Sequence, residues 1–322
     1  MAQKVENPTP ISGKTGLLGL LGWPVAHSFS PAMHNAAARA LGLDVVYVPL
    51  PVHPGQVEAA LRGLLALGFL GANVTVPHKK AVIPLLDDVD PAARAIGAVN
   101  TISISRESDG RPQTADPRRQ TADDQSAHAP VSNLQSPISN QLTGFNTDHA
   151  GFLADLQSHD VALPGRDCLV LGAGGAARAV VYTLAQAGAR VHIYARRPAQ
   201  AQQLVADLGS HLQDPVLVAR PWDALAHAGR FRAPLVVNTT PVGMYPHVDA
   251  SPWPGDTAFP PSAVLYDLIY NPRQTRLMQQ AQAAGSRAIN GLGMLLQQGA
   301  LAFELWMGVR PPLEVMAAEI GD

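Results

Sequence analysis

A glycine-rich turn between two regular elements is the part of this sequence best suited to chemistry. Gly172, Gly174 and Ala177 occupy the small positions of a G-x-G-x-x-G/A pattern, after the apolar run 168–171 and before a helix-forming run. The first glycine permits a tight turn, the second lets a pyrophosphate approach the backbone, and the third small residue lets helix and strand pack closely. Free N–H groups at the helix start then face the phosphates. We therefore expect a dinucleotide to contact Gly172, Ala173, Gly174, Gly175 and Ala176.

The end of the next strand indicates which dinucleotide binds. An NAD site places Asp or Glu about 20 residues beyond the glycines, where it binds the ribose 2′-hydroxyl. This chain has Ala195 at the end of the strand, followed by Arg196 and Arg197. A guanidinium can donate two charge-assisted hydrogen bonds to a 2′-phosphate, whereas a merely solvated arginine pair at a helix start would oppose the helix dipole. The sequence favours NADP(H).

A further loop of the same region should lie near the nicotinamide. Residues 238–244 leave the fourth strand of this region on the side where the cofactor is expected. Ligands of such sheets bind outside the carboxyl ends of the strands. Candidate contacts in this loop are Thr239, Gly243 and Met244.

Two serines near the start of the chain could bind a carboxylate. Ser28 and Ser30 lie two residues apart in a loop, and Pro31 then occupies the first position of a predicted helix. Hydroxyl groups at a helix N-terminus suit an anion. The alternative for Ser30 is a purely structural role as the N-cap of that helix.

A second polar cluster follows the third predicted strand. Strand side chains alternate, so Asn73 and Thr75 share one face, and Lys79 follows two residues after Pro77. Each could be an ordinary polar surface residue, but together they concentrate hydrogen-bonding groups and a cation at one strand end. Asp148 opens a later helix, and it is either an N-cap or a functional carboxylate.

The elements expected to position these residues alternate between strand and helix. In the first half we expect strands at 16–22, 44–50 and 69–77, helices at 31–41 and 56–67, a helical turn at 77–80, and a hairpin of 98–104 with 142–148. In the second half, strands are expected near 168, 191, 216, 235–237 and 264–268, with further helices from 291 and from about 312. Such alternation indicates a mainly parallel sheet with ligands at the strand carboxyl ends.

Residues 106–141 interrupt this pattern. The segment repeats Gln-Thr-Ala-Asp and contains few large apolar residues. Because it cannot bury a core, we expect a disordered surface insertion without a chemical role.

Composition limits the classes of function. The 322 residues are 47% hydrophobic and 15% charged, with a net charge of −2 and no basic block that would bind nucleic acid. No apolar run is long enough to span a membrane, and we do not expect the polar residues at the start of the sequence to form a signal peptide. The one cysteine, Cys168, is expected to be a buried core residue. We expect a cytoplasmic enzyme with a small-molecule substrate, without metal, and either monomeric or homodimeric.

Several of these stretches together resemble the shikimate dehydrogenase family. The matching motifs are His27-Ser28-Phe29-Ser30-Pro31, Asn73-Val74-Thr75-Val76-Pro77-His78-Lys79, Gly97-Ala98-Val99-Asn100-Thr101, Asn146-Thr147-Asp148, Gly172-Ala173-Gly174-Gly175-Ala176 and Gly291-Leu292-Gly293-Met294-Leu295. They cover nearly the whole chain in the family's order. The chain departs from the family pattern at Ala195 and Arg197, at His149, where the family has glycine, and in the 106–141 insertion.

The resemblance implies a fold of two α/β domains with an active-site cleft between them. A substrate domain of mainly parallel strands would comprise residues 1–149 and 289–322, and a Rossmann-type NADP domain residues 150–288. The implied reaction is the reversible reduction of 3-dehydroshikimate to shikimate by NADPH, a step of aromatic amino-acid synthesis.

The resemblance also implies individual roles. Ser28 and Ser30 would bind the substrate carboxylate, and Lys79 and Asp148 would form the catalytic pair. Further substrate contacts would come from Asn73, Thr75, Asn100, Tyr270 and Gln298, and further cofactor contacts from Gly291 and Met294.

Two other functions are compatible with much of this pattern. One is a quinate or dual-specificity quinate/shikimate dehydrogenase, with NAD as an alternative cofactor, and the other is a non-catalytic regulator that responds to NADP. The paired serines and paired arginines argue against the first. The presence of both Lys79 and Asp148 argues against the second.

Overall fold

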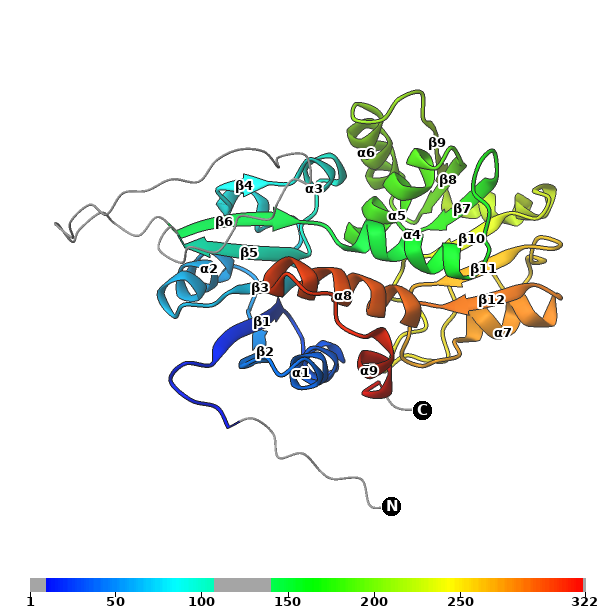
Figure 1. Ribbon diagram of the computed structural model, residues 1–322. Helices are drawn as coiled ribbons and strands as arrows, with labels where there is room; N and C mark the ends of the chain where they lie inside the picture. The colour runs from blue at the N-terminus through cyan, green and yellow to red at the C-terminus, as the bar shows by residue number, and fades with distance from the viewer. Residues whose placement is uncertain (1–9, 107–139, 321–322) are drawn as a thin grey trace, which may run out of the picture.

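The computed structural model describes residues 10–106 and 140–320, and in them two six-stranded sheets lie side by side, joined by helices (Figure 1). The first sheet has the order β2-β1-β3-β5-β6-β4. Its strands are β1 (Gly16–Gly22), β2 (Val45–Pro51), β3 (Gly71–Val74), β4 (Asp88–Val89), β5 (Thr101–Arg106) and β6 (Asn140–Phe145). The pairs β1–β2, β1–β3 and β4–β6 are parallel, whereas β5 runs antiparallel to both β3 and β6.

The register of this sheet brings the predicted polar loops to one edge. Leu20 of β1 lies opposite Asn73 of β3, so the carboxyl ends of these two parallel strands are adjacent. The loop carrying Ser28 and the loop carrying Lys79 therefore start side by side. The helices of this half are α1 (Ser30–Ala40), α2 (Val57–Ala66), α3 (Pro91–Ile96) and the 3-10 helix η1 (Ile83–Leu85).

The second sheet is parallel throughout and has the order β12-β11-β10-β7-β8-β9. Its strands are β7 (Asp167–Leu171), β8 (Arg190–Ala195), β9 (Val216–Pro221), β10 (Leu235–Asn238), β11 (Val264–Asp267) and β12 (Arg287–Asn290). The helices α5 (Gly175–Gln186), α6 (Pro198–Gly209), η2 (Trp222–Arg230) and α7 (Arg276–Ala283) connect them. The chain order reverses between β7 and β10, which is where a doubly wound sheet binds its ligand. Cys168 is buried in β7, as expected.

Two long helices cross between the sheets. α4 (Asp148–Ser158) leads from the first sheet to the second, and α8 (Leu292–Met307) packs along it and returns to the first (Figure 1). A Cβ on Gly151 would lie 2.7 Å from the backbone nitrogen of Gln298, so the two helices can cross this closely only at a glycine. At the far end of α8, the Trp306 indole donates a 2.9 Å hydrogen bond to the carbonyl of Ile102 in β5. The last helix, α9 (Leu313–Ala318), packs on α1.

Several expected boundaries differ from the structure. Ser30 is not an N-cap but the first residue of α1, which has Phe29 at the N-cap position, and its backbone N–H donates to the hydroxyl of Ser28 at 3.2 Å. Residues 77–80 form hydrogen-bonded turns rather than a helix, residues 98–100 precede β5, and β3 ends at Val74. β12 extends the second sheet to Asn290, beyond the boundary expected at 288.

The insertion is shorter than expected at both ends. Arg106 and Asn140 are paired across the β5–β6 hairpin, and Gln141 also lies in β6. These residues belong to the sheet because the backbone pairing of β5 with β6 continues past the apolar part of each strand. The rest of the predicted insertion, residues 107–139, lies outside the described residues.

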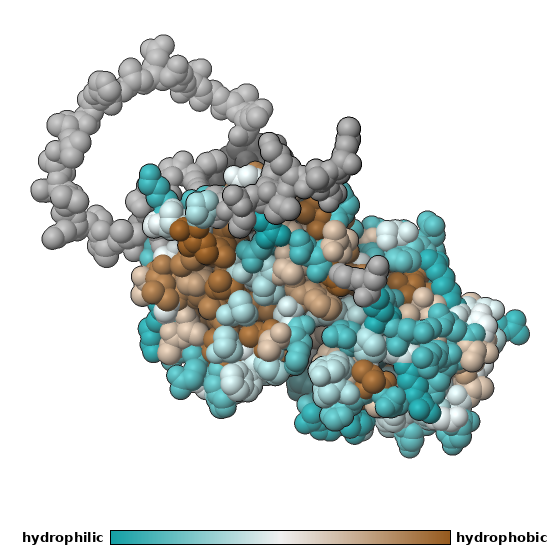
Figure 2. All heavy atoms as spheres, turned by 90° about the horizontal axis from the view of Figure 1, so that it is seen from below, coloured by the Kyte–Doolittle hydropathy of each residue, from teal (hydrophilic) through white to brown (hydrophobic). Residues whose placement is uncertain are grey.

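The surface seen from below combines hydrophilic residues with smaller hydrophobic areas (Figure 2). Among residues 10–106 and 140–320, none of the helices combines the length and the apolar character needed to cross a membrane.

A buried histidine lies at the centre of the first half. His34 of α1 is 1% exposed, and its ring stacks on Tyr47 with 4.3 Å between ring centroids. Phe303 and Trp306 of α8 approach the same ring at 6.0 and 5.6 Å. Burial lowers the pKa of His34 from 6.5 to about 3, because the charged form would lose its hydration.

This shift predicts that acid destabilises the fold. Between the two pKa values the unfolded chain binds a proton that the folded chain does not, so stability falls as the pH drops below 6.5. From His34 alone we expect a loss of about 2 kcal/mol in the free energy of unfolding between pH 7 and pH 5. Urea denaturation at both pH values measures it. His34→Phe should remove most of this pH dependence, and an equal loss in that variant would contradict the assignment.

Candidate active site

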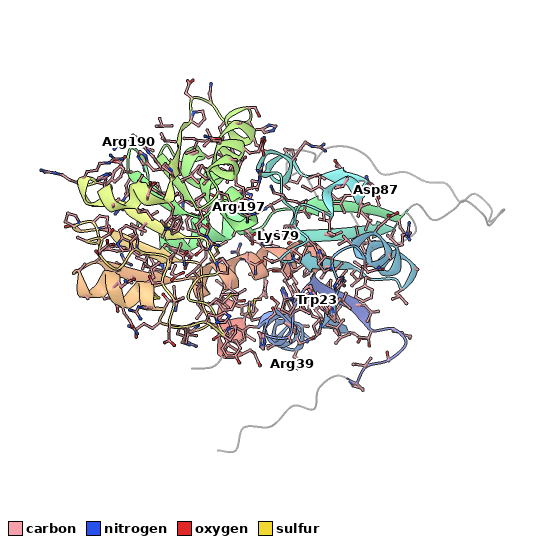
Figure 3. The ribbon with its side chains drawn as sticks, turned by 180° about the vertical axis from the view of Figure 1, so that it is seen from behind. Trp23, Arg39, Lys79, Asp87, Arg190 and Arg197 are labelled. Atoms are coloured by element: carbon pink, nitrogen blue, oxygen red, sulfur yellow. The ribbon has the colours of Figure 1, made fainter. Side chains whose placement is uncertain are left out.

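A buried ion pair lies where the two halves of the molecule meet. Lys79 follows β3 and Asp148 begins α4, and their Nζ and Oδ2 atoms are 2.5 Å apart (Figure 3 locates Lys79). The side chains are 16% and 8% exposed. Charges this deeply buried require further hydrogen bonds to offset lost hydration. The Asn100 amide supplies one, since its Nδ2 donates to the other carboxylate oxygen of Asp148 at 2.9 Å.

Several hydrogen bonds fix the orientation of the Asn100 side chain. Its Oδ1 accepts the backbone N–H of Thr147 at 2.7 Å, which fixes Nδ2 toward Asp148. Nδ2 also lies 3.3 Å from Oε1 of Gln298 on α8. The structure thus joins four predicted site residues, Lys79, Asp148, Asn100 and Gln298, into one hydrogen-bonded group.

A second set of buried polar contacts extends this group into β2. Asn73 donates to the backbone carbonyl of Asn100 (3.2 Å) and to the hydroxyl of Thr101 (3.1 Å). The Tyr47 hydroxyl donates to Oδ1 of Asn73 at 2.8 Å. Burial raises the pKa of Tyr47 well above its usual value, and a hydrogen bond with Ser30 opposes this rise.

The two serines lie at the other end of this network. Ser30 is 7% exposed and Ser28 is partly buried. Thr75 is partly buried against Gly22, whose Cβ would lie 2.3 Å from the Thr75 methyl group. Tyr270 reaches the serine loop from the second half, because its ring lies 5.7 Å from that of Phe29. Burial raises the pKa of the Tyr270 hydroxyl.

The glycine turn has the form expected for a phosphate site. Gly172 has φ +109°, a conformation that favours glycine, and a Cβ there would lie 2.6 Å from Oγ1 of Thr239. At Gly174 and Gly175 a Cβ would meet no atom within 4 Å, so the start of α5 opens onto free space. Ala173 and Ala176 are partly buried beside these glycines.

Two exposed cations lie beyond the end of β8. Ala195 ends the strand in a buried position, and Arg196 and Arg197 follow it on the surface. In the described part of the chain neither arginine forms an ion pair. Both guanidinium groups are therefore available for an anionic ligand.

The remaining predicted cofactor residues differ in exposure. In the loop after β10, the Thr239 hydroxyl donates to the carbonyl of Leu171 at 2.7 Å, Gly243 has φ +98° and Met244 is 46% exposed. At the start of α8, a Cβ on Gly291 would lie 2.1 Å from the carbonyl of Leu268, and Met294 is 7% exposed in the core.

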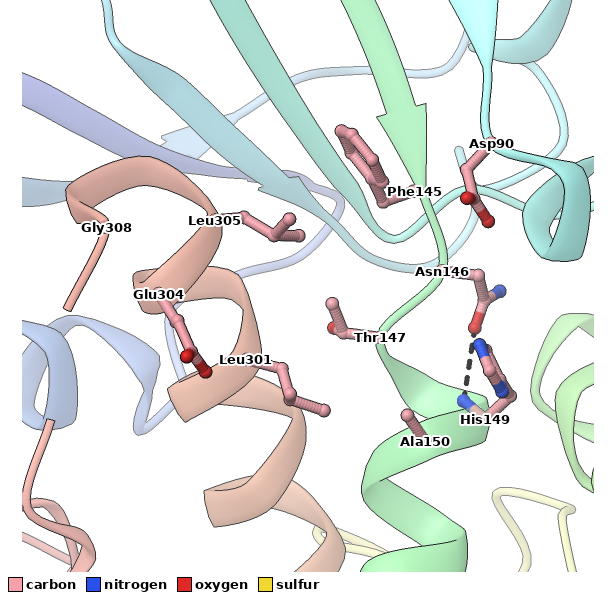
Figure 4. Close-up of a pocket in the computed structure, with 10 residues that line it drawn as sticks. All are labelled: Asp90, Phe145, Asn146, Thr147, His149, Ala150, Leu301, Glu304, Leu305 and Gly308. Atoms are coloured by element: carbon pink, nitrogen blue, oxygen red, sulfur yellow. Dashed lines mark hydrogen bonds between the residues drawn. The ribbon is translucent and has the colours of Figure 1, made fainter. Parts of the chain in front are cut away.

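A cavity of about 480 Å³ lies between α4, β6 and α8 (Figure 4). Lys79 and Asp148 are not among the residues that line it, although Thr147 and His149 on either side of Asp148 are. Asn146 accepts the backbone N–H of His149 at 3.2 Å, as the dashed line in Figure 4 marks. Leu301, Glu304 and Leu305 of α8 form the opposite wall, so this cavity lies apart from the Lys79–Asp148 pair.

The sequence reasoning missed the buried partners of the site. Tyr47, Thr101 and Thr147 all hydrogen-bond to Asn73 or Asn100, and all are at most 5% exposed. Thr101 and Thr147 directly adjoin predicted site residues, which is a signal that could have identified them. Tyr47 carries no comparable signal, because it lies in an otherwise ordinary apolar strand.

Comparison with known proteins gives a consistent result. Residues 20–102 match the family model described as the shikimate dehydrogenase substrate binding domain, and residues 291–320 match the shikimate 5′-dehydrogenase C-terminal domain. The chain is 44% identical to the shikimate dehydrogenase (NADP⁺) of Symbiobacterium thermophilum, over 94% of this chain and 93% of that protein. It is 45% identical to that of Moorella thermoacetica, over 95% and 92%.

A solved structure shows the same fold. The shikimate 5-dehydrogenase of Thermus thermophilus, crystallised with NADP(H) and shikimate, superposes with a TM-score of 0.75 and 36% sequence identity. The superposition covers 95% of this chain and 98% of that one.

Proposed function

The chain belongs to the shikimate dehydrogenase family, and we propose that the Lys79–Asp148 pair carries out proton transfer in its reaction. The protein is an NADP-dependent oxidoreductase that interconverts 3-dehydroshikimate and shikimate, a step toward chorismate and the aromatic amino acids. The observation that carries the residue assignment is the 2.5 Å contact of Lys79 with Asp148 at the junction of the two halves.

The residues present fit NADP. The open start of α5 offers backbone N–H groups to the pyrophosphate, and Arg196 and Arg197 offer two cations to the 2′-phosphate. The loop carrying Thr239, Gly243 and Met244 would lie beside the nicotinamide, with Gly291 and Met294 nearby. When bound, the reduced cofactor supplies the hydride.

Lys79 and Asp148 handle the accompanying proton. Reduction of a ketone leaves an alkoxide, so a proton donor must stand within hydrogen-bond reach. The Lys79 ammonium donates the proton, and Asp148 holds the ammonium in place and shares the transfer. Asn100 fixes the carboxylate, because it binds the oxygen that Lys79 does not contact, and the Thr147 backbone holds Asn100 in turn.

The polar side chains around the pair would bind a small polyhydroxylated acid. Ser28 and Ser30 would bind its carboxylate. Tyr270 of the second half lies beside this serine loop through its contact with Phe29. The substrate hydroxyl groups would be bound by Asn73, Thr75, Asn100, Asp148 and Gln298.

We also infer a domain division from this arrangement. The substrate domain would comprise residues 1–149 and 289–322, and the NADP domain residues 150–288. The protein acts in the cytoplasm on its small-molecule substrate, as a monomer or homodimer.

Replacing either member of the pair should lower kcat more than it changes KM. Loss of a general acid typically costs about 10²–10⁴-fold, so Lys79→Ala should fall in this range with an unchanged NADP dissociation constant. Asp148→Asn should also lose kcat while remaining folded. Steady-state kinetics from the NADPH absorbance, with fluorescence titration of the cofactor, measure both.

The double variant tests whether the pair acts as one unit. Groups that act together give non-additive losses, so Lys79→Ala/Asp148→Asn should be scarcely worse than the worse single variant. The adjacent exposed lysine gives a matched control, and Lys80→Ala should retain wild-type kcat. Fully additive losses would contradict the joint role, and an active Lys79→Ala would exclude it.

Neutralising the two arginines should weaken NADP binding selectively. Each charge-assisted hydrogen bond contributes about 1.5–3 kcal/mol, so Arg196→Gln/Arg197→Gln should raise the dissociation constant for NADP by about 100-fold or more. The dissociation constant for NAD should hardly change, since NAD lacks the phosphate. Equal losses for both cofactors would mean that the arginines act structurally.

Substitutions of Ser28 and Ser30 should have different effects on thermal stability but should both raise the KM for shikimate. Ser28 accepts the backbone N–H of Ser30 at the start of α1, so Ser28→Ala should raise the KM for shikimate and also cost about 1 kcal/mol of stability, the usual net contribution of one hydrogen bond. Ser30→Ala should raise the KM without the loss of that hydrogen bond. Thermal denaturation and steady-state kinetics give both quantities, with the exposed Ser12→Ala as control. An unchanged KM in Ser28→Ala would place the carboxylate elsewhere.

Substrate and cofactor choice is tested by a direct comparison. Purified protein should oxidise shikimate with NADP much faster than it oxidises shikimate with NAD, or quinate with either cofactor. Faster turnover of quinate or NAD would favour the sibling activity, and no turnover at all would favour a regulator.

A further inference from the structure

One buried arginine connects the two halves of the molecule. Arg178 lies in the first turn of α5, directly after the phosphate-binding turn, and is 5% exposed. A cation is unfavourable both in the interior and at a helix N-terminus. Its position therefore needs partners that offset this cost.

The partners come from both halves. Nε of Arg178 donates to the carbonyl of Ile96, the last residue of α3, and Nη1 donates to Asp207 of α6 at 2.8 Å. Ile96 belongs to the polypeptide between β4 and β5 of the first sheet, whereas Asp207 belongs to the second half. The carbonyl end of α3 favours a cation. Gly97, with φ +67°, leaves the necessary space, because a Cβ there would lie 2.7 Å from Nη2 of Arg178.

The segment that Arg178 holds touches both members of the catalytic pair. Its anchor, Ile96, lies shortly before Asn100 in the chain, and Asn100 donates to Asp148 at 2.9 Å. Between them, the backbone N–H of Val99 donates to the carbonyl of Lys79 at 2.8 Å. A displacement of residues 96–100 would therefore move Lys79 and Asp148 relative to each other.

We propose that Arg178 is a positioning residue that couples the phosphate-binding helix α5 to the catalytic pair by clamping residues 96–100 against the NADP domain. Arg178 touches neither substrate nor cofactor in this role. Its guanidinium instead bridges α3 and α6. The clamp transmits the position of the nucleotide-binding helix to the groups that transfer the proton.

This inference rests on the proposed function of Lys79 and Asp148, and its test uses the full-length enzyme. Arg178→Lys keeps the charge but cannot reach Ile96 and Asp207 together with the same geometry. A small misplacement of catalytic groups is costly, so we expect kcat to fall by about tenfold or more. KM for shikimate and the dissociation constant for NADP should change much less, and the pH profile of kcat should shift.

Two further variants keep the proposal testable if Arg178→Ala fails to fold. Asp207→Asn removes one anchor at a partly exposed position, and we expect a smaller fall in kcat in the same direction. In folded Arg178→Ala, added guanidinium at millimolar concentration should restore part of the lost kcat. Arg190→Lys is the matched control, because Arg190 also pairs with a carboxylate, Asp167, in the NADP domain but at an exposed site.

The outcomes separate the possible roles. A lower melting temperature with unchanged kcat in both Arg178→Lys and Asp207→Asn would overturn the proposal and make Arg178 purely structural. Weaker NADP binding with unchanged kcat at saturation would overturn it in favour of a direct cofactor contact. If the wild-type enzyme itself does not oxidise shikimate, the proposed function has failed, and that result is distinct from an active wild type with an equally active Arg178→Lys.

Discussion

The buried contact between Lys79 and Asp148 constrains much of the first half of the molecule. Two largely buried charges lose hydration that their attraction alone does not return, so each further lone pair needs a partner. Asn100 satisfies the second carboxylate oxygen, and the Thr147 backbone fixes the amide of Asn100. These groups come from three separate segments. The antiparallel pairing of β5 with both β3 and β6 brings them together, because it places the segment before β5 between the other two.

The arrangement around Asp148 also requires that α4 and α8 cross closely. α4 carries Asp148 at its first turn, and α8 carries Gln298 against the same helix. Their close approach depends on Gly151, where any side chain would collide with the backbone of α8. The same two helices connect the sheets, so the packing that supports the Asp148 carboxylate also positions the second sheet.

The sequence predicted those features that depend on interactions between residues close together in the chain. The turn at Gly172, the strand that leads into it and the exposed arginines after β8 depend on backbone conformation, apolar runs and charge within a few residues. The predicted cap of α1 was wrong because the helix begins one residue earlier than expected, with Phe29 at the N-cap position and no side-chain capping hydrogen bond. The helical turn expected at 77–80 is present only as hydrogen-bonded turns that do not continue into an α-helix.

The contacts missed from the sequence are those made between distant segments. Tyr47 hydrogen-bonds to Asn73, and Arg178 to Ile96, across separations in the chain that no local pattern encodes.

The exposed arginines after β8 and the largely buried Lys79 differ in where their opposite charge comes from. Arg196 and Arg197 are exposed, so under the proposed function their anionic partner is the 2′-phosphate of the ligand and they contribute to its affinity. Lys79 already has a built-in carboxylate partner, so a substrate adds little net attraction there. Under the proposed function its charge matters chiefly when an alkoxide develops, which is the condition for lowering a barrier rather than tightening binding.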